Sequence, residues 1–521
     1  MPRDFDEESV VQSPDSHRFI ARQGASRAIA FLVVVVWLAG VLVAAAHHEF
    51  WRDEVRALSI ARAAATPFDL VRLTRNEGHP LLWYVVLYLG SCVTASSVIL
   101  PVASIAIALG AVALLMLASP LPVWLGALFV FGLPLYEYSV SARNYGISML
   151  LMFTAAFFYR GRATHPLRLA VVLALLANTN AHSTILACLF AALWLTDGVV
   201  EKKAELRPPA SSLLVLVGGV ALASTVAIPH SDSVVSSWIR FEPGRLIEGA
   251  RSILADPGAT FASLVRWVPL PAPVPGAMIW VAILGLAAVR LRFLAAAVAA
   301  MLSLGLFFLT VYPGGLRHEA LLLVFVLALY WILLDEGAQL TPLRRRLFCA
   351  GLFVAIPLLL IGQINVAVTL WNLDVSGQAS SSKAFGSFLA SSLRYRDAIL
   401  VPEPDYLVES VPYYAGNRIW LAREHRFGTT ASFTSASDRT LSLGQLLADA
   451  HRIKSETGRP VLLVLSHPEL RGDAHEVVFS YDKVFTWTDE ETREMTDALL
   501  FVGSFDASYG DENYNVYEIR K

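Results

Sequence analysis

A succession of long apolar runs constrains this chain more than any other feature of its sequence. A helix needs roughly 20 apolar residues to cross the hydrocarbon core of a bilayer, and fewer where other helices surround it. Only 16% of the residues are charged, against about 25% in a soluble domain. The sequence therefore predicts an α-helical polytopic membrane protein with about 11 transmembrane helices. The predicted spans are 28–46, 97–118, 121–138, 144–159, 167–181, 183–197, 211–229, 276–290, 293–311, 317–334 and 347–371.

One further apolar stretch, residues 80–94, is ambiguous because it has only 15 residues. Short loops rich in Lys and Arg stay in the cytoplasm. If 80–94 crosses the membrane, the basic clusters at 18–27 and 160–168 fall on opposite sides. If it is an interfacial or re-entrant helix, every basic cluster is cytoplasmic. We therefore expect a multi-pass protein of the plasma (inner) membrane with a cytoplasmic tail at 1–27, a retained first span and a first outer loop at 47–96.

The last 148 residues, 374–521, differ in character from the predicted transmembrane domain at 28–373. They contain 15 Lys and Arg against 22 Asp and Glu. Runs of strand length alternate there with a stretch of helical periodicity, an order typical of a small α/β domain. The predicted strands are 398–403, 461–468 and 498–505, and the predicted helix is 442–458. We expect this domain to be extracytoplasmic.

Several functional classes are excluded by what the sequence lacks. No glycine-rich phosphate loop precedes a predicted helix of the C-terminal domain, which argues against a nucleotide site there. The charge balance provides no cationic face for nucleic acid. The cysteines, Cys92, Cys188 and Cys349, all lie in apolar stretches, so a disulfide framework or a cysteine-rich metal site is excluded.

Charged residues are densest in the first outer loop, and ionisable groups beside apolar spans usually serve function. Asp53 and Glu54 follow Trp51 and Arg52 where the first span leaves the bilayer. A carboxylate at a dry membrane face can have a raised pKa and act as a general base, or can coordinate a divalent cation. The structural alternative is that Asp53 caps the amphipathic helix that follows.

Isolated polar residues also lie near the end of this loop and in the next outer segment. His79 stands between Gly78 and Pro80, and such a bend aims its imidazole, although Pro also suits a plain helix entry. An unpaired Arg143 would be costly beside the membrane, so it should pair with Glu137 or with the phosphate of a ligand. A mutual salt bridge that joins two spans is the structural alternative.

Polar residues also interrupt two later apolar stretches. His182 lies within 178–183, and polar backbone breaks a span only where it lines a cavity or is packed inside protein. His182 is therefore a candidate ligand for a metal or a phosphate, with a hydrogen-bonded structural role as the alternative. Arg317 and His318 follow a Gly-Gly pair at a helix start, where the helix dipole favours an anion.

Taken in order, these residues resemble those of the GT-C class of membrane glycosyltransferases. The class includes the protein O-mannosyltransferases, the lipid A aminoarabinose transferases and the actinobacterial cell-wall arabinosyltransferases. The resemblance covers residues 28–371. It rests on the Asp-Glu pair in a long first outer loop, the later His-Pro that opens a juxtamembrane helix, and the S-x-x-A-R-x-Y pattern from Ser139 to Tyr145. This chain departs from the class in having Glu137 and no acidic residue close after Arg143.

The resemblance implies a polyprenyl-phosphate sugar as donor, an extracytoplasmic glycan, lipid or protein as acceptor, and inversion at the anomeric carbon. It implies Asp53 as the base, four residues near the donor phosphate, and a C-terminal domain that helps bind acceptor. The expected catalytic or metal-binding residues are Asp53 and Glu54. The expected substrate-binding residues are His79, Glu137, Arg143, Tyr145, His182, Arg317 and His318, with Arg143, Tyr145, Arg317 and His318 beside the phosphate.

The chemistry is coherent without the family, because a lipid-linked sugar phosphate needs an apolar groove, cations and a base. Three alternatives stay open. A flippase or polymerase for polyprenyl-linked glycans would suit the arginine-bearing loop at 230–275. A secondary transporter usually shows internal repeats, and none is visible here. The third is a non-catalytic binding protein. The sugar, the acceptor and the metal requirement are undetermined, and a divalent cation is possible.

Overall fold

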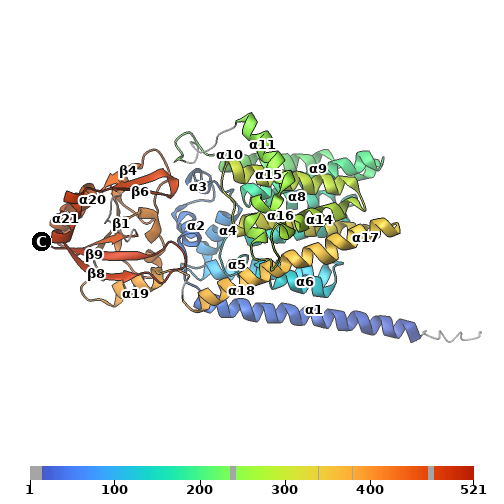
Figure 1. The fold of residues 1–521 in the computed structure, drawn as a ribbon, viewed down its shortest axis with the longest axis horizontal. Coiled ribbons are helices and arrows are strands. Elements are labelled where there is room, and N and C mark those ends of the chain that lie inside the picture. Colours follow the sequence, from blue (N-terminus) through green and yellow to red (C-terminus); the bar gives the residue numbers. More distant parts are fainter. Residues whose placement is uncertain (1–13, 235–241, 338–339, 378, 467–474, 521) are drawn as a thin grey trace, which may run out of the picture.

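A helical bundle and a sheet-containing domain lie end to end in the computed structural model (Figure 1). The model describes residues 14–234, 242–337, 340–377, 379–466 and 475–520. Residues 1–13 of the predicted cytoplasmic tail, part of the 230–275 loop and the end of the predicted strand at 461–468 fall outside these residues. The helices up to Val375 form the bundle, and the strands follow them in sequence.

Within the described residues, seven helices are long and apolar enough to cross a membrane. They include α1 (Pro14–His47), α5 (Ile99–Ala118), α9 (Ala181–Val200), α10 (Ala210–Ala227), α15 (Leu291–Thr310), α16 (Leu316–Glu336), and the continuous α17 (Pro342–Ala350), η4 (Gly351–Ala355) and α18 (Ile356–Val375). Shorter apolar helices fill four further places: α4 (Leu82–Val93), α7 (Tyr145–Tyr159), α8 (Pro166–Ala177) and α14 (Val274–Ala287). All but α4 lie in predicted spans, so the polytopic helical class is confirmed.

The predicted span at 121–138 differs most from the structure. It holds only α6 (Val123–Val130), followed by the 3-10 turn η1 (Leu133–Leu135). Pro134 lies inside that turn, and proline cannot donate the backbone hydrogen bond that would continue the helix. The chain from 133 to 144 therefore forms a buried turn at the end of the bundle instead of helix.

Helix α4, the ambiguous apolar stretch, begins and ends at the same end of the bundle. The Leu82 amide donates to the Asn178 carbonyl at the junction of α8 and α9. Just beyond the other end of α4, the Ala95 carbonyl accepts from Arg62 of α2 (Arg52–Ala63) at 2.6 Å. Figure 1 places α2, α3 (Asp69–Leu73) and α4 together on the side of the bundle that faces the C-terminal domain. Both ends of α4 thus lie at one end of the bundle, and its not crossing the membrane stays a prediction.

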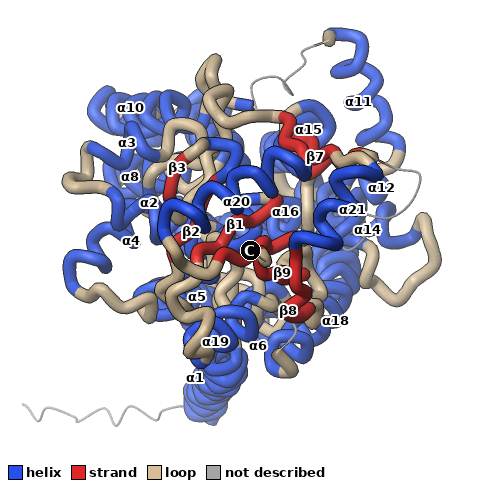
Figure 2. The backbone as a smooth tube through the Cα atoms, turned by 90° about the vertical axis from the view of Figure 1, so that its left-hand side faces the viewer, coloured by secondary structure: helices blue, strands red, loops and turns tan. Residues whose placement is uncertain are grey.

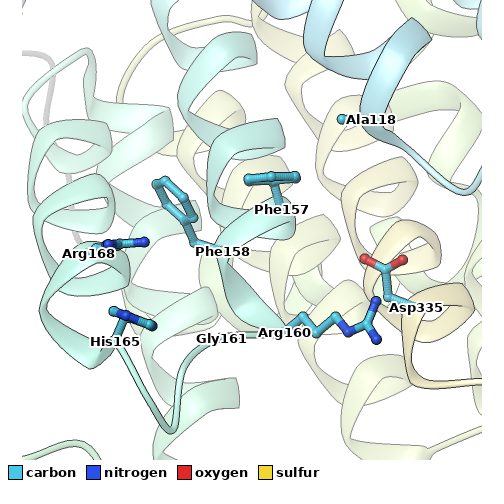
Figure 3. A pocket seen from close by; sticks show the side chains of 8 residues that line it. All are labelled: Ala118, Phe157, Phe158, Arg160, Gly161, His165, Arg168 and Asp335. Carbon is cyan, nitrogen blue, oxygen red and sulfur yellow. The ribbon is translucent and has the colours of Figure 1, made fainter.

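The basic loops that were predicted to share one side meet at the opposite end of the bundle. Arg162 and Arg292, from two of these loops, both pair with the buried Asp197, at 2.6 and 2.9 Å. A cavity of about 410 Å³ opens beside them between the ends of α5, α7 and α16, with Arg160 near Asp335 and Arg168 near Phe158 (Figure 3). None of the predicted site residues lines it.

The C-terminal domain contains two sheets, which Figure 2 shows in front of the bundle. The larger has the order β3-β2-β1-β5-β9-β8, and the smaller has the order β4-β7-β6. Strands β1, β2 and β5 run parallel, and β9 and β8 close the large sheet antiparallel. The strands are β1 (Ile399–Glu403), β2 (Arg418–Leu421), β3 (Arg426–Phe427), β4 (Thr440–Ser442), β5 (Val461–Leu465), β6 (Glu476–Phe479), β7 (Lys483–Thr486), β8 (Leu499–Phe505) and β9 (Tyr514–Ile519).

The helices of this domain are α19 (Ser382–Ser391), α20 (Leu443–Thr457) and α21 (Asp489–Ala498). Helix α20 begins at a Ser442 cap and ends at Gly458, whose φ of 65° places it in the left-handed region that glycine favours. The predicted helix at 442–458 and the three predicted strands are therefore confirmed, and so is the α/β class of the domain.

Candidate active site

One cavity of about 950 Å³ lies where the first outer loop, the neighbouring ends of the bundle helices and the C-terminal domain meet. Most of the residues that the sequence singled out line it, although they come from four separate segments. Those in the lining are Asp53, His79, Glu137, Arg143, His182, Arg317 and His318. Glu54 and Tyr145 are not in the lining.

Asp53 reaches the cavity from the first turn of α2. Its carboxylate forms an ion pair with Arg143 and lies 3.8 Å from Nε of Arg52. Burial raises the pKa of Asp53, but Arg143 and Arg52 outweigh it and hold that pKa well below its usual range. The expectation of a raised pKa is therefore wrong for Asp53 in this state, because the sequence did not show which cations would face it.

Glu54 supplies the helix cap that the sequence analysis had offered as an alternative role for Asp53. Its Oε2 accepts from the Trp51 amide at 2.9 Å, and its Oε1 accepts from the Ala142 amide at 2.5 Å. The same carboxylate pairs with His48 at 2.9 Å, and Glu54 is fully buried. These contacts give Glu54 a structural role at the start of α2, and Glu54 does not line the cavity.

Because Asp53 and Glu54 have different partners, they do not form a shared metal site. Across the described ranges, no group of three or more His, Cys, Asp or Glu side chains is placed to hold a metal ion. His48, the partner of Glu54, also contacts Asp374 at 2.7 Å. Burial lowers the pKa of His48, but the two carboxylates raise it to about 10, so His48 is a buried cation that joins the first loop to the end of α18.

Three guanidinium groups surround the indole of Trp51. The guanidinium carbons of Arg52, Arg143 and Arg317 lie 5.2, 5.7 and 5.0 Å from its ring centroid. Arg143 pairs with Asp53, while Glu137 pairs with Arg317 at 3.3 Å. Of the two partners predicted for Arg143, Glu137 is therefore not the one it has here, and the phosphate of a ligand stays a prediction. The cavity has a cationic pole in which three arginines face two carboxylates.

Histidines border this pole. His79 follows Gly78, whose φ of 69° requires glycine for the bend. Burial and the Arg143 charge lower the pKa of His79 to about 4, so its ring is neutral. Nδ1 of His79 and both ring nitrogens of His182 are buried and find no hydrogen-bond partner in the part of the chain that the structure describes. These nitrogens are free to bond a ligand in the cavity.

Tyr145 lies behind the cavity wall. Its ring packs edge-on against His318, with the centroids 5.2 Å apart, and it stacks with Tyr138. His318 itself accepts from the Gly315 amide at 3.1 Å, which fixes the start of α16. Tyr145 therefore supports His318 from behind the wall, and its contact with substrate stays a prediction.

An apolar arm extends from the cationic pole into the bundle. Its walls come from α9, α10 and α15, with one residue from α11 (Pro243–Ala255). Its residues include Ile185, Ala223, Ala227, Ile228, Leu246, Leu306, Phe307 and Val311. The same cavity thus combines a charged end with a lining suited to hydrocarbon.

The C-terminal domain contributes side chains that the sequence analysis missed: Tyr406, Glu409, Phe433 and Tyr481 line the cavity. Burial raises the pKa of Glu409 to about 7, although Arg56 opposes the shift. One signal could have identified two of these residues: Tyr406 and Glu409 follow β1, and the carboxyl ends of parallel strands are where α/β domains bind ligands.

Comparisons with known proteins agree with this fold. No family model matches the sequence, and no curated protein matches it. Among solved structures, the crystal structure of ArnT from Cupriavidus metallidurans in the apo state matches with a TM-score of 0.50 at 11% sequence identity. The match covers 96% of this chain and 98% of that chain, so it includes both the bundle and the C-terminal domain. This protein therefore has a GT-C-like fold, the fold of ArnT.

Proposed function

We propose that this protein is a glycosyltransferase that moves a sugar from a polyprenyl-phosphate donor to an acceptor at the outer face of the plasma membrane. One observation carries the proposal: a single cavity joins three guanidinium groups to an apolar arm between helices of the bundle. A lipid phosphate needs both, cations for its phosphate and an apolar groove for its chain. The GT-C-like fold supports the same conclusion.

The donor phosphate is best accommodated beside Arg143 and Arg317, in front of Trp51. Arg52 is already held by the C-terminal domain, because its Nη2 donates to Asp511 at 2.9 Å and its amide donates to Glu512 at 2.7 Å. In contrast, Arg143 and Arg317 each have one carboxylate partner at the pole, Asp53 or Glu137. A phosphate can take the place of these partners without leaving either cation unpaired.

Exchange of partners at Arg143 also accounts for how Asp53 can act as a base. While paired with Arg143, Asp53 has a pKa far below its usual range and is a weak proton acceptor. A donor phosphate that draws Arg143 away weakens that ion pair, and the pKa of Asp53 rises toward its ordinary value. The base is thus strengthened when the donor is in place.

The reaction is a single displacement. The acceptor hydroxyl oxygen attacks the anomeric carbon on the face opposite the phosphate while the Asp53 carboxylate takes the hydroxyl proton. The new carbon–oxygen bond forms as the bond to the phosphate oxygen breaks, and polyprenyl phosphate leaves with the electron pair. Arg143 and Arg317 stabilise the negative charge on the leaving oxygen. Configuration at the anomeric carbon is therefore inverted.

Purified full-length protein incubated with a panel of radiolabelled polyprenyl-phosphate sugars and an envelope extract tests the proposal. Transfer of label to the extract with an inverted linkage is expected. Movement of labelled lipid across liposomes without transfer would instead indicate a flippase, and retention of donor without either would indicate a binding protein. Either of those outcomes would overturn the proposed function.

A further inference from the structure

The C-terminal domain closes the cavity with four side chains, Tyr406, Glu409, Phe433 and Tyr481, which we name the domain patch. The rings of Phe433 and Tyr481 stack with centroids 3.9 Å apart and an interplanar angle of 17°. Tyr481 has a φ of 64°, and Asp482 after it has a φ of 54°. Non-glycine residues adopt this conformation only at a cost in energy, so the turn is held in a strained form that places an aromatic ring at the cavity.

Glu409 is fixed by the protein through one oxygen only. Its Oε1 accepts from Nη1 of Arg56 at 2.6 Å and from the Ala431 amide at 2.8 Å. Its Oε2 is buried and has no hydrogen-bond partner among the described residues. Glu409 as a whole is 3% exposed, and a buried acceptor without a partner is costly. This oxygen is therefore available to accept a hydrogen bond from a ligand in the cavity.

Asn76, in the first outer loop, also has a buried acceptor oxygen in the lining of the cavity. Its side-chain oxygen is buried, and the described part of the chain provides no hydrogen-bond partner for it. Arg56, which holds Glu409, also binds Glu77 beside Asn76 at 2.7 Å, so the loop and the domain patch are joined by one guanidinium. Two buried acceptor oxygens without a partner among the described residues thus lie in the same cavity as the aromatic rings of the domain patch.

We infer that the domain patch binds the acceptor, and that the acceptor is a carbohydrate. A sugar ring presents hydroxyl groups at its rim, which can donate to Glu409 and Asn76, and apolar C–H faces, which pack against aromatic rings. No residue of the domain patch belongs to a strand, so the patch lacks the open sheet edge that often binds an extended peptide. Asp53 lines the same cavity, where a hydroxyl of the bound ring can face it.

This inference rests on the proposed function, because only a glycosyltransferase has an acceptor. Its test measures saccharide binding and needs no donor. Detergent-purified full-length protein is applied to an array that carries diverse oligosaccharides beside Ser- and Thr-containing peptides. Retention on a subset of the oligosaccharides is expected, and the dissociation constant for the best of them is then measured in solution. Glu409→Gln should weaken that binding by about ten- to a hundredfold, as expected for loss of a hydrogen bond to a charged group.

Asn76→Ala is the second variant, because no hydrogen bond to the described protein is lost with its side-chain oxygen. It should weaken oligosaccharide binding while leaving the thermal midpoint unchanged. If Glu409→Gln folds poorly, the affinity of Asn76→Ala for the oligosaccharide tests the inference instead. Glu494→Gln, at an exposed position of α21, is the matched control and should bind as the unaltered protein does.

Retention on peptides in preference to saccharides, or no retention on any saccharide, would overturn the inference. Wild-type affinity in both Glu409→Gln and Asn76→Ala would do the same. Failure of the proposed function is a separate result: it would appear as saccharide binding without transfer from any polyprenyl-phosphate sugar. Transfer to peptides would uphold glycosyl transfer and reject the carbohydrate acceptor.

Discussion

Asp53→Asn is the most informative perturbation of the candidate active site, because it keeps the shape of the side chain and removes its charge. The fold should tolerate it. The start of α2 is capped by Glu54 and not by Asp53, the Asp53 side chain is 31% exposed, and the Asn oxygen can still accept from Arg143. We therefore expect a folded protein with a thermal midpoint close to that of the unaltered chain.

Turnover and donor affinity should move in opposite directions in this variant. Loss of a general base lowers the rate by about 10² to 10⁴, which corresponds to about 3 to 5 kcal/mol in the activation free energy. Donor binding should tighten, because Asp53 competes with the phosphate for Arg143. Two negative charges roughly 7 Å apart repel by about 1 to 2 kcal/mol at an effective dielectric constant of about 20 to 40, which predicts a donor dissociation constant about five- to thirtyfold lower.

The assay measures both quantities on the same preparation. Single-turnover transfer from radiolabelled lipid donor gives the rate of the chemical step, and equilibrium retention of that donor in the absence of acceptor gives the affinity. Asp497→Asn, at an exposed position of α21, makes the same chemical change far from the cationic pole and should leave both quantities unchanged.

Two results would refute the reasoning. Near-normal transfer by folded Asp53→Asn protein would remove Asp53 as the base and leave Glu77, Glu137 and Glu409 as the carboxyl groups to test, since each lines the cavity. Weaker donor binding in the variant would show that Asp53 serves to position Arg143 for the phosphate and does not compete with it.

Three further predictions follow from the same geometry. Arg317→Ala should raise the KM for the lipid donor more than it lowers kcat, because a phosphate contact made in the ground state is uniform binding; an unchanged KM would contradict the proposed phosphate site. Cysteine placed at Ala163, in a chain whose own cysteines are replaced, should resist an impermeant thiol reagent in intact cells, and efficient labelling would reverse the proposed orientation. The pKa of His48 is raised from 6.5 to about 10 in the folded protein, so its contribution to stability is complete below about pH 6.5 and is lost as the pH rises through about 10. The thermal midpoint should therefore fall over this range, and His48→Gln protein, lower at neutral pH, should show a flatter profile; parallel profiles would count against the buried cation.

Much of the architecture could be predicted from the sequence because its signals are local. Apolar length located the helices that can cross a membrane, and the distribution of basic residues predicts that α4 does not cross. Periodicity and the glycine at 458 located α20 and its end. The breaks at 78, at 178–183 and before α16 located the polar residues that line the cavity, since backbone that interrupts an apolar helix needs a cavity or protein around it.

Tertiary structure alone decided which charged side chains form ion pairs and which of them face the cavity. Asp53 and Glu54 are neighbours in sequence, yet one faces the cavity and the other caps its own helix. Arg143 pairs with Asp53, which is 90 residues away in sequence, and not with Glu137, which is nearer in sequence. The C-terminal domain brings Glu409 into a site formed mainly by the first 320 residues. Ion pairing and desolvation depend on distances of a few ångström between segments far apart in the chain, and residue order does not encode those distances; they are set when the bundle and the C-terminal domain pack together.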